Sequence, residues 1–315
     1  MPSEILVARE HLPTALRTAR RAGEIERIRR GAYRVVPDDG SGRPDTWSAA
    51  RRLQVDRARA LGRQLRTAHW FSHQTAAMLH GLPLWRLPSE THLLQTYRAS
   101  SRAAADVRRH FVEVRPPDGG EVLGLPVTTL ERTVADCATT LPPLDALVVA
   151  DAALARGLDR DRTVQLVRAR SRGARRALLV LDLADPGAES PWESWLRYVG
   201  HWAGLPRPRT QVPVSTAIGD FRVDLGWEDH GVLAEFDGLV KYRAGALGPD
   251  HDPDRARIAE KRRSDAIAES TGTRPLHVTS RDAPDPQAVA DRLLARFPAD
   301  VRRAVRRNPL LPRPR

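Results

Sequence analysis

The sequence predicts a mixed α and β fold with several domains, and three observations lead to this prediction. Residues 221–227 and 232–238 alternate apolar and polar side chains, the pattern of half-buried β-strands. Near the N-terminus, a helix-like stretch with arginines on one face precedes two strand-like stretches. Between these regions, helix start and stop signals alternate with short apolar strands. A chain of 315 residues has room for two or three domains.

The charge distribution favours a polyanionic partner such as DNA. The net charge is +12 and the pI is about 11.0, although an arginine-rich composition alone produces such values. Of the 51 basic residues, only Lys241 and Lys261 are lysine. The excess of basic over acidic residues lies at the two ends of the chain. Residues 1–66 carry 15 arginines and 8 acidic residues, and residues 296–315 carry 7 arginines and one acidic residue.

The cysteine content and the N-terminus predict a cytoplasmic protein without a membrane partner. Cys137 is the only cysteine, so an internal disulfide and a cysteine-based zinc site are excluded. The first eleven residues contain Glu4, Arg9 and Glu10 and no long apolar core, unlike a signal peptide. No apolar run approaches the length needed to span a membrane.

Residues 1–36 predict a winged helix-turn-helix. We expect one helix from about Glu4 to His11, a second from Pro13 to Arg21, and then a strand, a turn and a strand. An arginine face beside a basic hairpin suits a DNA groove, although a solvated arginine surface would look the same. The residues expected to contact nucleic acid here are Arg17, Arg20, Arg21, Arg27, Arg29 and Arg30.

The chain divides by composition into four regions: 1–66, 67–184, 185–300 and 301–315. The first region includes a polar helix over 46–66, after a linker over 37–44, and the last is a basic tail. In the middle region we expect helices over 72–80, 130–138, 144–155, 163–170 and 174–181, with strands over 91–95 and 109–114. Its histidines have no partner carboxylate at a fixed spacing, so we interpret them as structural or surface residues: His69, His73, His80 and His110.

The third region contains the most informative motif, a hairpin with two acidic strands. We expect a helix over 191–203, a strand over 211–214, the hairpin, a helix over 254–271, a strand over 276–279 and a helix over 286–296. A symmetric hairpin register forms one apolar face from Trp227 with Val232, Leu225 with Ala234, and Val223 with Phe236. On the other face, it pairs Asp224 with Glu235 and Arg222 with Asp237.

The pairing of Asp224 with Glu235 predicts a metal site. Two carboxylates directly opposite on a sheet have Cβ atoms about 5 Å apart and repel each other unless a cation lies between them. Mg²⁺ is bound by one or two protein carboxylates together with water and phosphate oxygens. We therefore expect Asp224 and Glu235 to bind Mg²⁺ or Mn²⁺, whereas a shifted register would leave them as solvated carboxylates.

The order of elements in this region resembles the PD-(D/E)XK nuclease fold, with an αβββαβ core, and is closest to its Vsr-like branch. Asp224 matches the acid of the first motif strand, and Glu235 matches the acid of the (D/E)XK strand. Glu193 matches a helix glutamate that often joins the site, but Ser190 and Glu193 also form a capping box. Asp237 occupies the usual lysine position, and Lys241 stands where related branches place a substitute cation or base.

The resemblance implies an Mg²⁺-dependent endonuclease whose catalytic residues are Glu193, Asp224, Glu235, Asp237 and Lys241. Lys261, Arg262 and Arg263, on the helix after the hairpin, could clamp phosphates or form ion pairs within that helix.

The N-terminal two-thirds resembles AbiEi-type antitoxins of type IV toxin–antitoxin systems. The stretches that carry this resemblance are residues 23–33, 72–77, 81–83 and 126–136. It implies a DNA-binding transcriptional regulator with a possible cognate toxin as partner. Three functions stay open: a regulator with an active DNA nuclease, a regulator with an inactive nuclease fold that binds DNA or toxin, and an RNA-processing nuclease.

Overall fold

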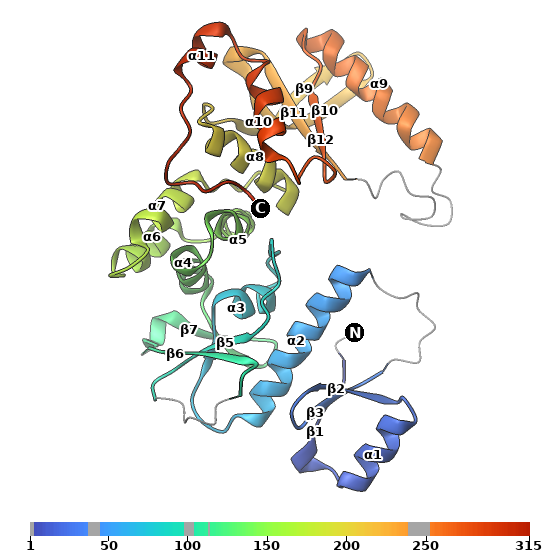
Figure 1. Cartoon of the computed structure of the whole chain (residues 1–315), viewed down its shortest axis with the longest axis vertical. Helices are drawn as coiled ribbons and strands as arrows, with labels where there is room; N and C mark the ends of the chain where they lie inside the picture. Colours follow the sequence, from blue (N-terminus) through green and yellow to red (C-terminus); the bar gives the residue numbers. More distant parts are fainter. Residues whose placement is uncertain (1–2, 37–44, 98–103, 113, 239–252) are drawn as a thin grey trace. The chain divides into compact units, whose positions relative to one another are not determined.

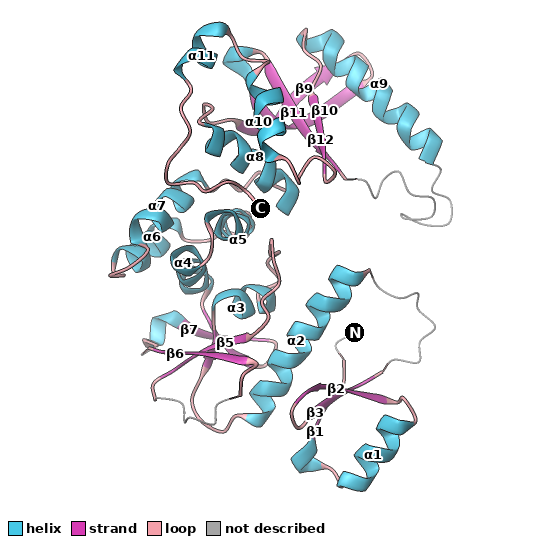
Figure 2. Cartoon of the chain, in the orientation of Figure 1, coloured by secondary structure: helices cyan, strands magenta, loops and turns pink. Residues whose placement is uncertain are grey.

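The computed structural model describes residues 3–36, 45–97, 104–112, 114–238 and 253–315. Helices and strands are mixed along these residues, which confirms the mixed α and β class (Figures 1 and 2). The chain divides into two units, Met1–Leu141 with Leu158–Leu178 and Pro142–Gly157 with Leu179–Arg315. None of the helices in the described ranges is both long enough and apolar enough to cross a membrane.

The N-terminal part of the first unit is a small antiparallel sheet in the order β1-β3-β2. Its elements are β1 (Ile5–Val7), the 3₁₀ turn Ala8–Glu10, α1 (Pro13–Arg21), β2 (Ile25–Arg29) and β3 (Ala32–Val35). Pro13 begins α1 because its missing N–H costs nothing in the first turn, and Gly23 follows the helix with φ +78°.

The predicted helix from Glu4 to His11 is wrong. Ile5 and Val7 are 4% and 2% exposed, and the pairing of Ile5 with Arg34 places them in a strand beside β3. Their alternation fits a strand of period two, and β-branched side chains favour that conformation. Only Ala8–Glu10 forms a helical turn, so the segment before α1 lacks the first full helix that the sequence predicted.

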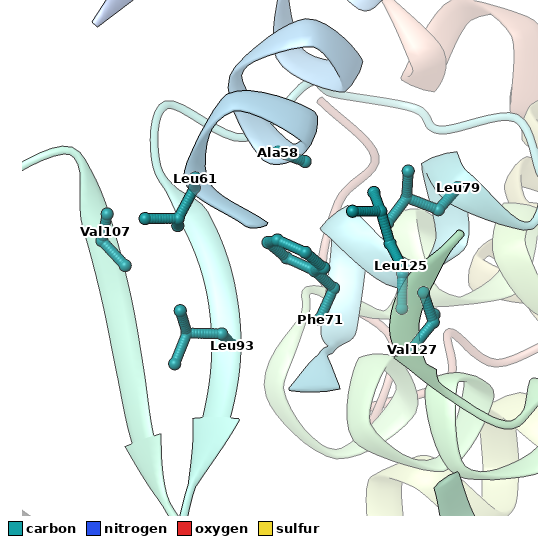
Figure 3. Packing of buried hydrophobic residues seen from close by; sticks show 9 residues of the cluster. Ala58, Leu61, Phe71, Leu79, Leu93, Val107, Leu125 and Val127 are labelled. Carbon is teal, nitrogen blue, oxygen red and sulfur yellow. The ribbon is translucent and has the colours of Figure 1, made fainter. Parts of the chain in front are cut away.

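Helix α2 (Thr46–Gln64) forms as predicted and connects this sheet to the rest of the unit. The Asp45 carboxylate accepts hydrogen bonds from the backbone N–H groups of Trp47 and Ser48, both at 3.0 Å, and so caps the helix. Figure 3 shows the buried cluster beneath it, in which Phe71 lies among side chains from α2 and the next sheet. The labelled members are Ala58, Leu61, Phe71, Leu79, Leu93, Val107, Leu125 and Val127.

The second sheet of this unit has five strands in the order β6-β5-β4-β8-β7. They are β4 (Trp70–Phe71), β5 (Thr91–Gln95), β6 (Val107–Phe111), β7 (Gly119–Val122) and β8 (Leu125–Thr128), with the 3₁₀ turn Pro116–Asp118 before β7. Strand β6 begins two residues before the predicted 109–114, because Val107 is buried and pairs with Thr91.

Buried ion pairs join α4 (Leu130–Thr140) to its neighbours in the first unit. The other helices that follow α2 are α3 (His73–Leu79) and α6 (Arg160–Arg168), and α7 (Ala174–Leu183) contains the boundary between the units. Asp136, 2% exposed, accepts hydrogen bonds from Arg132 of α4 and from Arg170 just after α6. Arg132 also lies 3.6 Å from Asp118, so the opposite charges balance one another inside the unit.

Cys137 is expected to be unreactive in the folded protein. Its side chain is fully buried in α4, and burial raises the pKa of the thiol well above its usual value. Because the thiolate is the reactive form, Ellman's reagent should label the native chain at most slowly and label the urea-unfolded chain at once. Rapid labelling of the native protein would contradict the packing of α4.

The second unit is built on a four-stranded sheet in the order β12-β11-β10-β9. Its strands are β9 (Arg209–Thr216), β10 (Gly219–Trp227), β11 (Val232–Asp237) and β12 (Leu276–Thr279), and the 3₁₀ turn Glu228–His230 joins β10 to β11. The first three strands are antiparallel, whereas β11 and β12 run parallel. Its helices are α5 (Pro143–Leu154), α8 (Pro191–Ala203), α9 (Pro253–Thr271), α10 (Pro286–Leu294) and α11 (Ala299–Ala304).

Helix α5 belongs with this second unit, although the sequence grouped it with the middle region. Asp151 of α5 forms an ion pair with Arg197 of α8 at 2.5 Å, and both side chains are 1% exposed. Asp151 also accepts hydrogen bonds from the Ser194 hydroxyl at 2.6 Å and the Asp185 N–H at 2.9 Å. A buried ion pair with these additional hydrogen bonds can hold α5 and α8 in one register, which agrees with the assignment of α5 to the second unit.

Candidate functional site

The β10–β11 hairpin has the predicted register next to its turn, but the pairing ends at Leu225 and Ala234, so the predicted pairs of Asp224 with Glu235 and Val223 with Phe236 lie beyond the ladder. Leu225 pairs with Ala234, Gly226 with Leu233, and Trp227 with Val232. The apolar face is confirmed, because its side chains in β10 and β11 are at most 3% exposed: Val223, Leu225, Trp227, Val232 and Ala234. Phe236, at the end of this face, stacks on Trp192 of α8 with ring centroids 4.9 Å apart.

Asp224 lies where the hairpin opens. One of its carboxylate oxygens accepts a hydrogen bond of 2.7 Å from the backbone N–H of Phe236. The carboxylate thus bonds to β11 just beyond the pair formed by Leu225 and Ala234. Burial, the negative charge of Glu193 and, more weakly, that of Glu235 raise the pKa of Asp224 to about 7. At neutral pH, this carboxyl group therefore holds its proton about half of the time.

Glu193 approaches the same point from α8, and it also caps that helix. The Glu193 N–H donates to the Ser190 hydroxyl at 3.2 Å, and the Glu193 carboxylate accepts from the Glu189 N–H at 2.9 Å. Its Oε2 also accepts from the Gln211 amide at 3.2 Å. Burial raises the pKa of Glu193, and its charge acts on Asp224. The two interpretations of Glu193 are therefore compatible, because Ser190 caps α8 through the Glu193 N–H while the Glu193 carboxylate, bonded to the Glu189 N–H, acts on Asp224.

Glu235 is 3% exposed and is held by an arginine from α9. Arg263 donates to its two carboxylate oxygens at 2.5 and 3.0 Å, to Glu260 at 3.0 Å and to the Arg222 carbonyl at 2.8 Å. Of the three basic residues predicted on this helix, Arg263 thus points into the acidic site, and Lys261 and Arg262 are exposed. Burial raises the pKa of Glu235 despite this partner.

His277 completes the site and was not predicted. In the parallel pairing of β11 with β12, Glu235 lies opposite His277. The His277 Nδ1 lies 2.9 Å from Asp237 and 3.9 Å from Glu235. The hydrogen bond to Asp237 raises the pKa of His277. The predicted pairing of Asp237 with Arg222 is wrong, because Arg222 instead forms an ion pair with Glu189 at 3.0 Å.

These side chains form a strongly negative, half-buried cluster that suits a cation. The carboxylates of the cluster are Glu193, Asp224, Glu235, Asp237 and Glu260, and its cationic side chains are Arg263 and His277. The ligand atoms of Glu235, Glu260 and His277 lie within 4.8 Å of one another. Carboxylate oxygens are the ligands that Mg²⁺ and Mn²⁺ prefer. Lys241, the remaining predicted catalytic residue, lies outside the described residues.

In the first unit, five of the six predicted nucleic-acid contacts are exposed. They are Arg17, Arg20 and Arg21 on α1, Arg27 on β2, and Arg30 in the turn after it. Arg29 differs: its side chain is 5% exposed, and it binds Asp106 at 3.1 Å and the Gln64 side chain. Arg29 therefore contributes to the packing of β2 against the rest of the unit.

A basic concavity of about 670 Å³ lies beside β2. Arginine side chains dominate the part of its lining that comes from the N-terminal sheet and α2: Arg27, Arg29, Arg30 and Arg57. Arg57 donates to the Ile28 carbonyl at 3.0 Å, and Arg29 is neutralised in part by Asp106. The concavity thus places Arg57 beside the exposed Arg27 and Arg30.

Comparisons with known proteins identify no family. No family model matches the chain, and no curated protein matches it. A crystal structure of the RV2827C protein from Mycobacterium tuberculosis is similar to part of the chain, with 18% sequence identity and a TM-score of 0.37. The match covers 56% of this chain and 71% of that chain.

Proposed function

We propose that the second unit is a divalent-metal-dependent nuclease and that Asp224 and Glu235 are its metal ligands. The observation that carries this proposal is the convergence of carboxylates at the open end of the hairpin, where ligand atoms of Glu235, Glu260 and His277 lie within 4.8 Å of one another. Burial and the neighbouring charges of Glu193 and Glu235 raise the pKa of Asp224 to about 7, which agrees with this crowding. Carboxylates packed against one another in this way destabilise the ionised site. A bound cation would relieve that repulsion, which is a common reason for such an arrangement at a catalytic centre.

The residues of the site fit Mg²⁺ or Mn²⁺, because Asp224, Glu235 and Glu193 offer hard oxygen ligands from three different elements. When bound, such an ion would neutralise charge on a phosphodiester and make a water molecule more acidic. Arg263 and His277 supply positive charge next to these carboxylates and could bind phosphate oxygens. Asp237 favours the charged form of His277, so this pair replaces in part the lysine that is missing from the motif.

The proposal is tested by incubating the full-length protein with plasmid DNA, single-stranded DNA and RNA in the presence of Mg²⁺, Mn²⁺ or EDTA. Metal-dependent cleavage that a Glu235→Gln variant lacks would support it. If RNA is cut in preference to both DNA substrates, the RNA-processing alternative is correct. If nothing is cut and the variant binds DNA as tightly as the native protein, the nuclease fold is inactive and serves binding.

Metal affinity should depend on pH through Asp224. Since its pKa is about 7, a metal that binds the carboxylate must displace a proton at lower pH. We expect the apparent affinity for Mn²⁺ to fall by about tenfold per pH unit below 7 and to level off above 8. At pH 6, about 0.9 proton should be released per ion bound. Calorimetry in two buffers of different ionisation enthalpy measures this release, and an affinity independent of pH would exclude Asp224 as a ligand.

We propose further that the first unit binds DNA as an AbiEi-like regulator, with α1 and the β2–β3 hairpin as its winged helix-turn-helix. The support is the exposed arginine face of α1 beside the exposed Arg27 and Arg30. The 3₁₀ turn Ala8–Glu10 would stand in for the first helix of the motif. A cognate toxin remains a proposed partner of this regulator.

Replacing Arg17, Arg20 and Arg21 together by alanine should weaken DNA binding and reduce its salt dependence. If all three contact phosphates, the slope of log K against log salt should become shallower by about 2.7. Fluorescence anisotropy at several salt concentrations measures the slope. The matched control replaces Arg172, Arg175 and Arg176, which are also exposed and carry the same charge. Equal losses of DNA affinity in the two triple variants would show that DNA binding depends on the overall charge rather than on the arginines of α1.

A further inference from the structure

Three histidines that are distant in the sequence meet in the first unit. His73 begins α3, His92 lies in β5 and His110 lies in β6. Strands β5 and β6 are parallel, with His92 opposite Arg108 and Leu94 opposite His110. The two histidines are thus two register positions apart and on the same face of the sheet, where α3 brings His73 against them.

The ring nitrogens of these histidines are spaced for a shared metal ion. The His92 Nδ1 lies 3.2 Å from the His110 Nε2, and the two nitrogens share a hydrogen bond in which one of them is the donor. Two nitrogens bound to a tetrahedral zinc at 2.0–2.1 Å are about 3.3 Å apart, so this pair already has the required separation. One ligand atom from each of the three residues lies within 4.8 Å of the others. The His73 ring stacks on His110 at 4.0 Å and must tilt, because stacked rings direct their lone pairs in parallel.

The orientation of His73 is held by its own surroundings. Its Nδ1 lies 2.9 Å from the Ser72 hydroxyl, a contact of the kind that orients metal-binding imidazoles through their second nitrogen. The residue is 5% exposed and has φ +53°, a left-handed conformation that is strained for a side chain with a Cβ. Such strain persists only where the surrounding structure enforces it, and it is concentrated at functional sites.

We propose that His73, His92 and His110 bind one Zn²⁺ ion through one ring nitrogen each, with a fourth coordination position open. Imidazole nitrogen is a preferred zinc ligand, and three histidines with an open position form the arrangement found in catalytic rather than closed structural sites. His92 and His110 are only half-buried, so the ion and a fourth ligand can reach the site from solvent.

The charge state of the cluster agrees with this proposal. Burial lowers the pKa of His92 and of His110 to about 4, and it lowers the pKa of His73 well below its usual value. All three rings are therefore neutral at pH 7, and when His92 and His110 both bind a metal, the proton that their nitrogens share moves to the other nitrogen of its ring. Arg132 and Arg170, which act on His73, are both bonded to Asp136, and Arg108, which acts on His92 and His110, lies 3.6 Å from Glu90, so each of these cations near the cluster has a carboxylate partner.

The test is calorimetric titration of the metal-free, full-length protein with ZnCl₂. We expect tight binding that His92→Ala and His110→Ala each weaken by at least about a hundredfold. His11→Ala removes an exposed histidine of the same unit and should leave zinc binding unchanged. His277→Ala should remove zinc binding at the acidic cluster only, so the two sites are distinguished. An absence of zinc binding in the His277→Ala variant, or zinc binding that persists in a His110→Ala and His277→Ala double variant, would overturn the proposal.

A second measurement serves if the cluster variants fail to fold. The native protein is treated with diethylpyrocarbonate with and without Zn²⁺, and the modified histidines are identified by mass spectrometry. Zinc should protect His92 and His110 and leave the modification of His11 unchanged. Equal modification of His92 and His110 in both conditions would contradict a shared site.

Discussion

An Asp224→Asn variant is expected to be more stable than the native protein and at least about a thousandfold slower in metal-dependent cleavage. Asparagine keeps an oxygen that can accept the Phe236 N–H at the position of the present 2.7 Å bond. It removes the charge that Glu193 and Glu235 repel and, with it, a hard metal ligand. Stability and function should therefore change in opposite directions, as at many active sites.

The gain in stability should depend on pH. The folded-state pKa of Asp224 is raised from 3.8 to about 7, so its contribution to stability is complete below pH 4 and is lost as the pH rises through 7. The asparagine variant lacks this loss. We expect little difference from the native protein at pH 4 and an increase in the free energy of unfolding of about 4 kcal/mol at pH 8. Urea unfolding at both pH values, followed by tryptophan fluorescence, measures the difference.

The control for this variant is Asp220→Asn, which changes an exposed aspartate of the same strand. It should alter neither stability nor cleavage. If Asp224→Asn instead loses stability at pH 8, the carboxylate has a structural role and the mutual repulsion inferred at the site is wrong. If it retains cleavage, Asp224 is not a metal ligand.

Replacing Asp151 by alanine should lower the free energy of unfolding of the second unit by about 3–5 kcal/mol, a larger loss than we expect from the other single substitutions. Arg197 would be left 1% exposed without its carboxylate partner, and the Ser194 hydroxyl and the Asp185 N–H would lose their acceptor. This loss of stability comes chiefly from leaving the buried charge of Arg197 unpaired. Replacing both members of the pair by apolar residues should therefore be less harmful than replacing one.

Hydrogen exchange followed by mass spectrometry tests this prediction in the full-length protein. Amides of α5 and α8 should exchange much faster in Asp151→Ala than in the native protein. The exposed Asp220→Ala serves as control and should leave their exchange unchanged. If the amides of α5 and α8 exchange as slowly in Asp151→Ala as in the native protein, the prediction is wrong. It is also wrong if the double variant Asp151→Ala with Arg197→Met is no more stable than Asp151→Ala alone, because the loss would then not come from the unpaired charge.

Local patterns in the sequence were sufficient to predict most helices and strands, because interactions between residues close in the sequence favour those conformations. The alternation in residues 221–238 predicted the hairpin and its register next to the turn, since a shift by one residue would expose its whole apolar face. Helix α1 was predicted from Pro13, which favours the start of a helix, and from Gly23, which favours its end, because each residue favours particular backbone angles. The strand Ile5–Val7 was missed because three residues are too few to distinguish the two periodicities.

The composition of the candidate sites was decided by tertiary structure. The acids Asp224 and Glu235 could be selected from one hairpin, but Arg263 and His277 reach them through packing of α9 and parallel pairing of β12, which no local pattern specifies. The histidine cluster shows the same effect more strongly. His73 and His110 looked scattered in the sequence and His92 was not singled out, and the three meet because β5 and β6 pair in parallel and α3 covers that face. Contacts between distant segments depend on the order of strands in a sheet, and that order is set by burial of the whole core rather than by any short stretch of sequence.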